Sequence, residues 1–224
     1  MNNPIFTVIF LLLGTAVLII LLFFTGKARI RRKLGKAPIK KISEFKSGET
    51  AKIKGKIEII GDPVIAPLSK RKCAYYHVVV EKKVYNGQNI SWKTIIDKEF
   101  SGTFVIKDGS EYAYIDRGNI KSYIILDRNY KSGLSKDAHP VLEAYLKSHG
   151  YDTKGVFGLN NTFRYKEGIL GKGETIAVLG RGKWKDTQEA GLPAHYKNIL
   201  VISQEKGEYV YLSDDPDVVE GTMY

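Results

Sequence analysis

The most apolar part of the chain lies at its start. The run from Pro4 to Phe24 contains no charged residue, and about 20 apolar residues at 1.5 Å each span roughly 30 Å as a helix, the thickness of a bilayer hydrocarbon core. A cleaved signal peptide would have a basic start and a shorter apolar core, whereas this chain begins with the uncharged sequence MNNP. We therefore expect a transmembrane helix over residues 1–25.

The next segment, residues 26–44, is strongly basic and has no acidic residue before Glu44. Because Gly26, Gly35 and Pro38 interrupt it, we predict a juxtamembrane linker. Positive charge beside a membrane helix stays in the cytoplasm, which predicts a single-pass cell-membrane protein with its N-terminus outside and the rest of the chain cytoplasmic. Six residues are predicted to contact anionic lipid headgroups, although the charge could simply set the topology: Lys27, Arg29, Arg31, Arg32, Lys33 and Lys36.

From residue 45 to residue 212 the pattern changes to short runs of β type. In Ala51–Ile60, isoleucines alternate with lysines, which is the period of a half-exposed strand. The β-branched run of residues 78–80 also favours a strand. Turn residues such as those of KDGS at 107–110 separate the runs. The predicted strands are Ala51–Ile60, Ala74–Val84, Ile90–Phe100, Gly102–Lys107, Glu111–Asp116, Tyr123–Asp127, Asn161–Leu170, Glu174–Leu179, Lys197–Ser203 and Glu208–Leu212.

One helix interrupts this series. The segment HPVLEAYLKSHG has Pro140 in its first turn, an apolar stripe, and Gly150 as a stop. The predicted fold class is therefore mainly β, a small barrel or sandwich with one short helix, following an N-terminal transmembrane helix. A Gly-Glu-Thr turn occurs at 48–50 and again at 173–175, which is compatible with two related β units or with coincidence. Residues 213–224 are predicted to form an acidic C-terminal tail.

Charge and cysteine content restrict the function classes. The formal net charge is +11, and eight of these positive charges lie in the basic segment, which leaves about +3 for the remaining chain. The high charge is therefore mostly a feature of residues 27–41. A single cysteine excludes an intrachain disulfide framework and agrees with a reducing compartment.

Thiol and metal chemistry fit the sequence poorly. In a strand, Cys73 and His77 would lie about 13 Å apart, beyond hydrogen-bond reach, so a catalytic pair is not expected and Cys73 is interpreted as a structural residue. The four histidines are scattered, without the paired Cys and His spacing of zinc sites. The glycine-rich residues 168–182 match neither a phosphate loop nor a dinucleotide-binding loop. We predict no catalytic residue, no metal and no cofactor.

Nucleic-acid binding stays open as an alternative. Small OB-like barrels bind single strands with aromatic platforms and basic grooves, and Lys and Arg residues alternate with Tyr75 and Tyr76 in this chain. The net charge of about +3 outside the basic segment argues against it, and strand tyrosines commonly pack across a sheet. We therefore do not expect a nucleic acid among the partners.

Several segments together resemble one known family. They are AKIKGKI at 51–57, PVIAPLSKRKCAYYHVVVEKK at 63–83, DGSEYAYID at 108–116 and FRYKEGILGKGETIAVLGRGKW at 163–184, with Trp92 between the second and third. They resemble the GIDE domain, also called the beside-a-membrane domain, of the MULAN/GIDE membrane-bound E3 ubiquitin ligases. The resemblance covers about residues 45–212. Its most specific parts are the run from Pro67 to Tyr76 and the block from Arg164 to Gly173.

The resemblance implies a membrane-tethered β module that binds a protein partner beside the membrane. In the eukaryotic ligases a second membrane helix and a RING domain follow, and this sequence has neither after Leu212. Ubiquitin transfer, or a role as a ligase subunit, is thus an alternative that the family suggests and the missing RING opposes. The motif residues form the predicted interaction surface: Arg71, Lys72, Tyr75, Tyr76, Arg164 and Glu167.

Overall fold

The computed structural model describes residues 26–133, 139–153, 161–205 and 207–222, together with Val8 and Gly14. The transmembrane helix expected over residues 1–25 falls outside this part of the chain, apart from those two residues. Among the described residues, every helix is too short or too polar to cross a bilayer.

Five strands close into a small barrel. Their order is β2 (Thr50–Ile59), β7 (Phe104–Asp108), β8 (Glu111–Ile115), β13 (Asn198–Ser203) and β12 (Thr175–Asp186), and β12 pairs back with β2. All neighbours are antiparallel except β8 and β13, which are parallel. The prediction of a mainly β protein with a small barrel is confirmed. The order, with a parallel pair between the third and fifth barrel strands, is that of OB-fold barrels.

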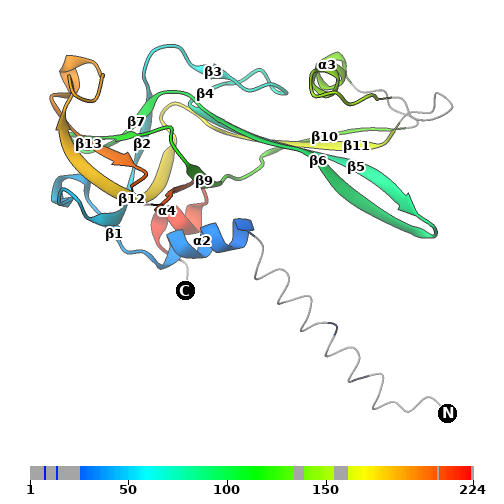
Figure 1. Ribbon diagram of the computed structural model, residues 1–224, viewed down its shortest axis with the longest axis horizontal. Helices are drawn as coiled ribbons and strands as arrows, with labels where there is room; N and C mark the ends of the chain where they lie inside the picture. The colour runs from blue at the N-terminus through cyan, green and yellow to red at the C-terminus, as the bar shows by residue number, and fades with distance from the viewer. Residues whose placement is uncertain are drawn as a thin grey trace.

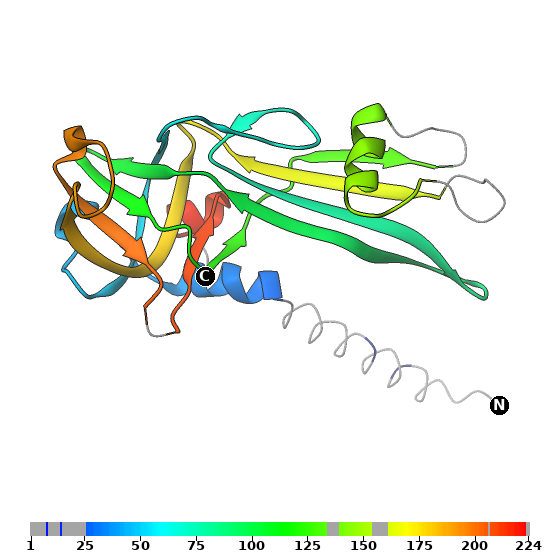
Figure 2. The same ribbon diagram turned by 45° about the horizontal axis from the view of Figure 1, so that its top comes forward.

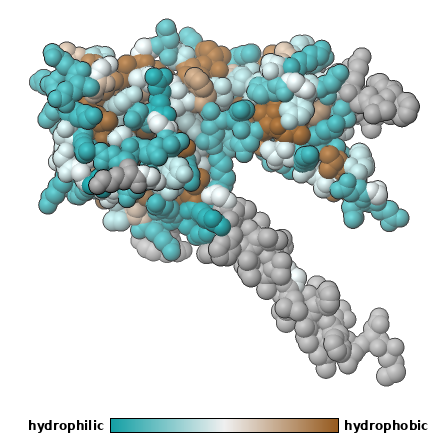
Figure 3. Space-filling view, in the orientation of Figure 1, coloured by the Kyte–Doolittle hydropathy of each residue, from teal (hydrophilic) through white to brown (hydrophobic). Residues whose placement is uncertain are grey.

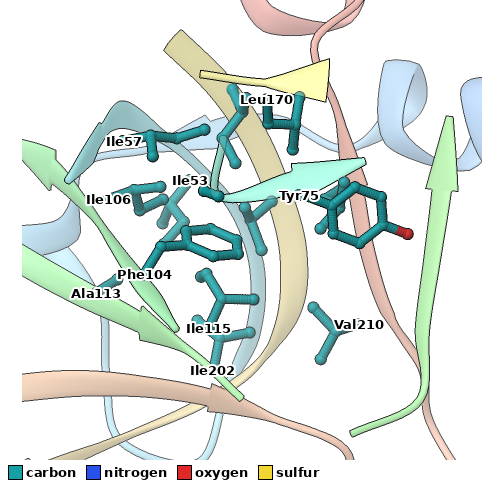
Figure 4. Packing of buried hydrophobic residues seen from close by; sticks show 14 of the residues in the cluster. Ile53, Ile57, Tyr75, Phe104, Ile106, Ala113, Ile115, Leu170, Ile202 and Val210 are labelled. Carbon is teal, nitrogen blue, oxygen red and sulfur yellow. The ribbon is translucent and has the colours of Figure 1, made fainter. Parts of the chain in front are cut away.

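The inside of the barrel is filled by aliphatic side chains from all five strands. Ile53, Phe104, Ile115 and Ile202 are fully buried there and face one another (Figure 4). This closed arrangement follows from the period-2 alternation, because every second residue of each strand points inward. Three short strands extend the sheet beyond the barrel: β1 (Ile39–Lys40), β14 (Val210–Ser213) and β9 (Ile120–Tyr123).

The two Gly-Glu-Thr turns lie at opposite ends of one strand pair. Gly48 and Gly173 both adopt positive φ, at 88° and 82°, which favours glycine. Each turn leads into a barrel strand, and these strands, β2 and β12, pair antiparallel. Gly48 donates its N–H to the carbonyl of Gly182, and Gly173 donates its N–H to the carbonyl of Ile57. The two Gly-Glu-Thr turns thus hold the β2–β12 pair, which closes the barrel, at both of its ends.

A second, four-stranded sheet projects from the barrel as an arm. Its order is β10 (Arg128–Ser132), β11 (Phe163–Leu170), β5 (Tyr75–Asn86) and β6 (Asn89–Ser101), all antiparallel. The hairpin of β5 and β6 extends furthest from the barrel, and helix α3 (Pro140–Ser148) covers one face of the arm (Figures 1 and 2). The sequence predicted this helix and most of these strands.

The arm and the barrel share side chains at their junction. Tyr75, the first residue of β5, and Leu170, the last of β11, are buried in the barrel core (Figure 4). Beyond them the arm has its own cluster, which packs Val78, Val80 and Phe163 of the sheet against Leu142 and Leu146 of α3. The short hairpin of β3 (Val64–Ile65) and β4 (Lys72–Cys73) lies beside this cluster.

Residues 26–44 differ from the predicted linker. Gly26–Lys36 form helix α2, and a 3-10 turn, η1, covers Ile42–Glu44. Leu34 is fully buried and Ile30 packs in the same cluster, because residues four apart share a helix face. The side chain of Arg31 binds Asp215 and Asp217, with N–O distances of 2.7 Å in both cases. The folded unit therefore begins earlier than residue 45.

The expected acidic tail is also part of the fold. Residues 216–220 form helix α4 (Pro216–Glu220), whose N-cap is Asp215. Val218 and Val219 are buried against α2 and β12. The prediction failed because the acidic residues were interpreted as solvated, whereas Asp215 and Asp217 neutralise a basic helix about 190 positions earlier in the sequence.

One predicted strand is wrong. Tyr123–Asp127 was expected to be extended in a sheet, but β9 ends at Tyr123 and β10 begins at Arg128. The intervening chain crosses β11 at Gly168, where a Cβ atom would lie 2.3 Å from the carbonyl oxygen of Ile125. These residues carry the chain from barrel to arm, and the side chain of Ile124 packs in the barrel core.

Candidate functional site

An apolar hollow of the described surface lies on the arm. It is a groove of about 790 Å³ between the turn after β3, strand β10 and helix α3. Hydrophobic residues are visible on the arm beside α3 (Figure 3). Leu68, Tyr130, Val141 and Leu142 provide the apolar lining. The remaining lining residues are polar or basic: Ser69, Lys70, Asn129, Lys131 and His139.

One wall of the groove is an edge strand. β10 is the last strand of the arm sheet and pairs only with β11 among the described strands. An edge strand presents unpaired backbone groups to a further strand. Apolar side chains beside such an edge are the arrangement used by domains that bind an extended peptide by strand addition.

The opposite wall is the turn of residues 66–71, which a buried carboxylate holds in place. Glu167 of β11 is fully buried, and its two oxygens accept the backbone N–H groups of Leu68 and Ser69 at 2.8 and 3.0 Å. Lys70 adopts a φ of 60°, which is uncommon for a residue with a side chain. The hydrogen bonds from this turn to Glu167 thus hold Leu68 toward the groove.

Arg71 reinforces the same turn from outside. Its guanidinium binds both oxygens of Asp127, at 2.6 and 2.8 Å, and lies 3.9 Å from the Glu167 carboxylate. Hydrogen bonding from Arg71 is the main cause that lowers the pKa of Asp127. Lys72 follows in β4 and is exposed. Of the predicted interaction residues, Arg71 and Glu167 therefore position the groove wall.

The remaining predicted interaction residues are dispersed. Tyr75 is 2% exposed and belongs to the barrel core, so the prediction that it contacts a partner is wrong, as it is for the buried Glu167. Tyr76 stacks on Phe100 with ring centroids 5.8 Å apart. Arg164 lies on the other face of the sheet, where it binds Glu81. Pleat alternation separates these residues, which a linear motif does not reveal.

A charged cluster lies where α2 meets the base of the arm. His77 of β5 and the carboxylates of Asp97 and Glu99 of β6 place ligand-type atoms within 4.8 Å of one another. The sequence missed this group because the register of β5 against β6 brings it together. The ammonium of Lys27 binds Glu99, and the Tyr75 hydroxyl donates to the same carboxylate. The chain thus supplies its own cation where a divalent ion would have to bind.

The pKa values of the two carboxylates reflect this arrangement. The hydrogen bond from His77 lowers the pKa of Asp97. Burial acts to raise the pKa of Glu99, but hydrogen bonds from Lys27 and Tyr75 outweigh it and the pKa is lowered. Burial strongly raises the pKa of the Tyr75 hydroxyl. Both carboxylates therefore stay charged, and Glu99 ties α2 to the arm.

Cys73 is confirmed as a buried residue. It has no exposed surface, and its thiol lies 3.5 Å from the carbonyl oxygen of Val64. Burial raises its pKa to about 11, so the nucleophilic thiolate is scarce at neutral pH. His77, on the next strand β5, is paired with Asp97 at 2.7 Å instead. Cys73 and His77, which were not expected to form a catalytic pair, thus lie in two different environments.

The basic residues assigned to lipid contact have structural partners in part. Lys27 binds Glu99, Arg31 binds Asp215, and Lys33 donates to the Tyr211 hydroxyl at 3.2 Å. Lys33 and Lys36 are exposed at the end of α2. A second hollow of about 760 Å³ lies beside the helix and includes Arg29 and Lys121 in its lining. Helix α2 therefore combines docking on the domain with exposed positive charge.

The outer face of the barrel is where the alternative of nucleic-acid binding would place its ligand. OB-fold barrels bind strands over the second and third barrel strands, which here are β7 and β8. Residues of the β12–β13 connection, including Leu192 and Tyr196, pack there against Val105 and Tyr112. The ring of Tyr112 contacts Tyr196 edge to face, with centroids 4.9 Å apart. The surface where a single strand would stack is thus covered by the chain's own loop.

Comparisons of the chain with protein-family models, with curated proteins and with solved structures found no match.

Proposed function

We propose that this chain is a single-pass membrane protein whose folded domain lies on the cytoplasmic side and binds a protein partner beside the bilayer. The observation that carries the proposal is the apolar groove of about 790 Å³ along the free edge of β10. The groove combines a turn that Glu167 holds in place, an edge strand and an apolar lining. This combination suits an extended peptide better than a small polar substrate.

The proposed partner binds as an additional strand on β10. Its backbone would pair with the edge, and alternate apolar side chains would enter the groove between Leu68 and Leu142. Lys70 and Lys131 at the rim favour acidic residues on either side of the apolar ones. The partner segment is thus expected to be extended, apolar at alternate positions and acidic at its ends.

The membrane part of the proposal rests on the sequence. The uncharged run of residues 4–24 has the length of a membrane span, and the basic residues that follow it favour a cytoplasmic domain. The resemblance to the GIDE domain supports the same location and a partner-binding role. Helix α2 directly follows this run, so its docking on the domain would hold the domain close to the bilayer.

Two alternatives have less support. Ubiquitin transfer by the chain itself would need a RING or a reactive thiol, and Cys73 is buried with a raised pKa. Single-strand nucleic-acid binding would use the face of β7 and β8, over which Leu192 and Tyr196 pack. A role as a partner of a ligase is compatible with the proposed binding groove.

Site-specific photo-crosslinking in intact cells tests this function. A photoreactive residue is placed in the full-length chain at Asn129 on β10, and the matched control carries it at Lys185 on the exposed part of β12. We expect a protein adduct from Asn129, absent from Lys185 and lost when Val141→Arg puts a charge into the groove. Adducts of equal yield from both positions, or adducts that persist with Val141→Arg, would contradict the proposal.

A further inference from the structure

The face of the arm opposite α3 carries an unusual set of side chains. In β5 the even-numbered residues Val78 and Val80 pack toward α3, so the odd-numbered residues point to the other face. Strand register places Ile90 opposite Tyr85 and Trp92 opposite Lys83 on that same face. We call this surface, made by Lys83, Tyr85, Ile90, Trp92 and Arg164, the open face of the arm.

The open face exposes apolar groups at the end of the hairpin. Tyr85 is 62% exposed and Ile90 is 56% exposed, and the two form a cross-strand pair next to the turn. The α3 face of the same hairpin instead has a pair of lysines, Lys82 and Lys93. At the end of the hairpin, the exposed apolar side chains therefore lie on the open face.

Basic groups stand directly over the aromatic rings of the open face. The Arg164 guanidinium lies 4.4 Å from the centre of the Trp92 ring, and the Lys83 ammonium lies 5.3 Å from that of Tyr85. Arg164 is fixed in this position by its paired hydrogen bonds to Glu81. Aromatic rings beside Lys and Arg are typical of segments that lie at the boundary between lipid headgroups and acyl chains.

The open face lies near helix α2, which directly follows the expected membrane span. Glu99, at the base of this face, binds Lys27 at the start of α2, and His77 lies 3.7 Å from the same carboxylate. In both ribbon views the tip of the β5–β6 hairpin lies on the same side of the molecule as α2 (Figures 1 and 2). From His77 to Tyr85 the strand covers about 26 Å at 3.3 Å per residue. The hairpin could thus reach a bilayer at a second point, away from the anchor.

We infer that the open face of the arm binds an anionic bilayer surface, with Tyr85, Ile90 and Trp92 at the level of the headgroups and with Lys83 paired to lipid phosphates or carboxylates. This inference rests on the proposed membrane anchoring. It adds that the domain is held at two points, the anchor and the hairpin, which orients the β10 groove relative to the membrane.

The two tryptophans of the chain provide a direct test. Trp184→Phe leaves Trp92 as the only tryptophan, and Trp92→Phe leaves Trp184, which lies in the barrel and donates to the carbonyl of Phe45 at 2.8 Å. Full-length variants are reconstituted into vesicles of phosphatidylcholine and phosphatidylserine that contain brominated lipid. We expect bromine to quench Trp92 and shift its emission to the blue, and we expect no such change for Trp184.

Charge variants test the electrostatic part. Lys83→Glu lies on the open face, and Lys98→Glu, at an exposed position of the same hairpin opposite Val78, is the matched control. We expect Lys83→Glu to reduce the quenching of Trp92 and Lys98→Glu to leave it unchanged. Quenching that is equal with and without phosphatidylserine, or equally reduced by both variants, would overturn the assignment to anionic lipid.

Alkaline extraction of the same vesicles separates this inference from the proposed anchoring. A chain that resists extraction while Trp92 stays unquenched would overturn the inference and leave anchoring in place. A chain that is extracted although Trp92 was quenched would overturn anchoring and support lipid contact, and a chain both extracted and unquenched would overturn both. Shielding of Trp92 only in native membranes would assign the open face to a protein and overturn the inference.

Discussion

The barrel and the arm use similar strands but differ in what covers them. The barrel closes on itself, so both edges of its sheet are used and its inward side chains form one apolar core. The arm is a single layer with α3 on one face and an open face on the other, and among the described strands β10 pairs on one side only. Apolar groups left exposed and an unpaired edge are liabilities in a fold unless something binds them. The difference indicates that the barrel is the support and the arm carries the binding surfaces.

The largest expected effect is in the barrel core. Phe104→Ala removes a fully buried ring and should lower the free energy of unfolding by about 3–5 kcal/mol, because the rigid barrel cannot close the cavity. The matched control is Phe100→Ala on the arm, where the ring is 52% exposed; its loss should cost at most about 1.5 kcal/mol. Denaturant unfolding measures both. Equal losses would contradict the contrast between the two regions.

The next effect concerns the junction. Gly168→Ala puts a Cβ atom 2.3 Å from the Ile125 carbonyl oxygen, so the crossing chain must move, at a cost of about 1–3 kcal/mol. Gly118→Ala is the control, since its Cβ would only touch Gln204 at 3.9 Å. Hydrogen exchange should become faster at the base of the arm in the first variant. Unchanged exchange there would show that barrel and arm are not coupled at this crossing.

A comparable change is expected in the groove wall. Glu167→Gln weakens the acceptors of the Leu68 and Ser69 N–H groups inside the protein, which should cost about 1–3 kcal/mol and loosen residues 66–71. Asp127→Asn, which affects an exposed ion pair of Arg71, should cost at most about 1 kcal/mol. Exchange rates of the turn amides distinguish the two. If both variants leave the turn equally protected, Glu167 does not hold it.

The sequence predicted the local elements better than the contacts between them. Alternating isoleucines identified β2, and Pro140 with Gly150 bounded α3, because these signals lie within the element itself. Helix α2 was missed although Ile30 and Leu34 have the four-residue spacing of a helix face, since the surrounding charges suggested a solvated segment. Their partners, such as Asp215, are brought near only by the barrel.

The candidate site could be predicted only in part for the same reason. The motif pointed to Arg71 and Glu167, which do build the groove wall, but a motif does not tell which side chains are buried. The groove also needs β10 and α3, which come from a separate part of the chain. The cluster of His77, Asp97 and Glu99 depends on strand register, which no linear spacing encodes.

A pH dependence of stability is also expected at the junction. Asp214 accepts a hydrogen bond from the Ile125 N–H at 2.9 Å, and burial raises its pKa from 3.8 to about 7. Between these two pH values the folded state keeps a proton that the unfolded state has lost, so stability should fall as pH rises from about 4 to about 7, by less than about 1.4 kcal/mol per pH unit.

Asp214→Asn should remove this part of the pH dependence, since an amide does not titrate. The measurement is the difference between the unfolding free energies of the two proteins at pH 5 and at pH 7. Taking the difference cancels the other carboxylates, such as Asp97, whose lowered pKa affects stability only at more acidic pH. A difference that does not change with pH would contradict the raised pKa of Asp214.

Hydroxyl-radical footprinting tests most directly the claim that the arm binds and the barrel supports. The full-length protein is labelled in intact native membranes and again after purification in detergent, and the oxidation of each aromatic residue is compared by mass spectrometry. We predict protection in membranes of Tyr130 in the groove and of Tyr85 and Trp92 on the open face, with no change at Tyr112 of β8 and at Tyr209, which directly precedes β14. Protection of the barrel tyrosines with Tyr130 unchanged would contradict the account.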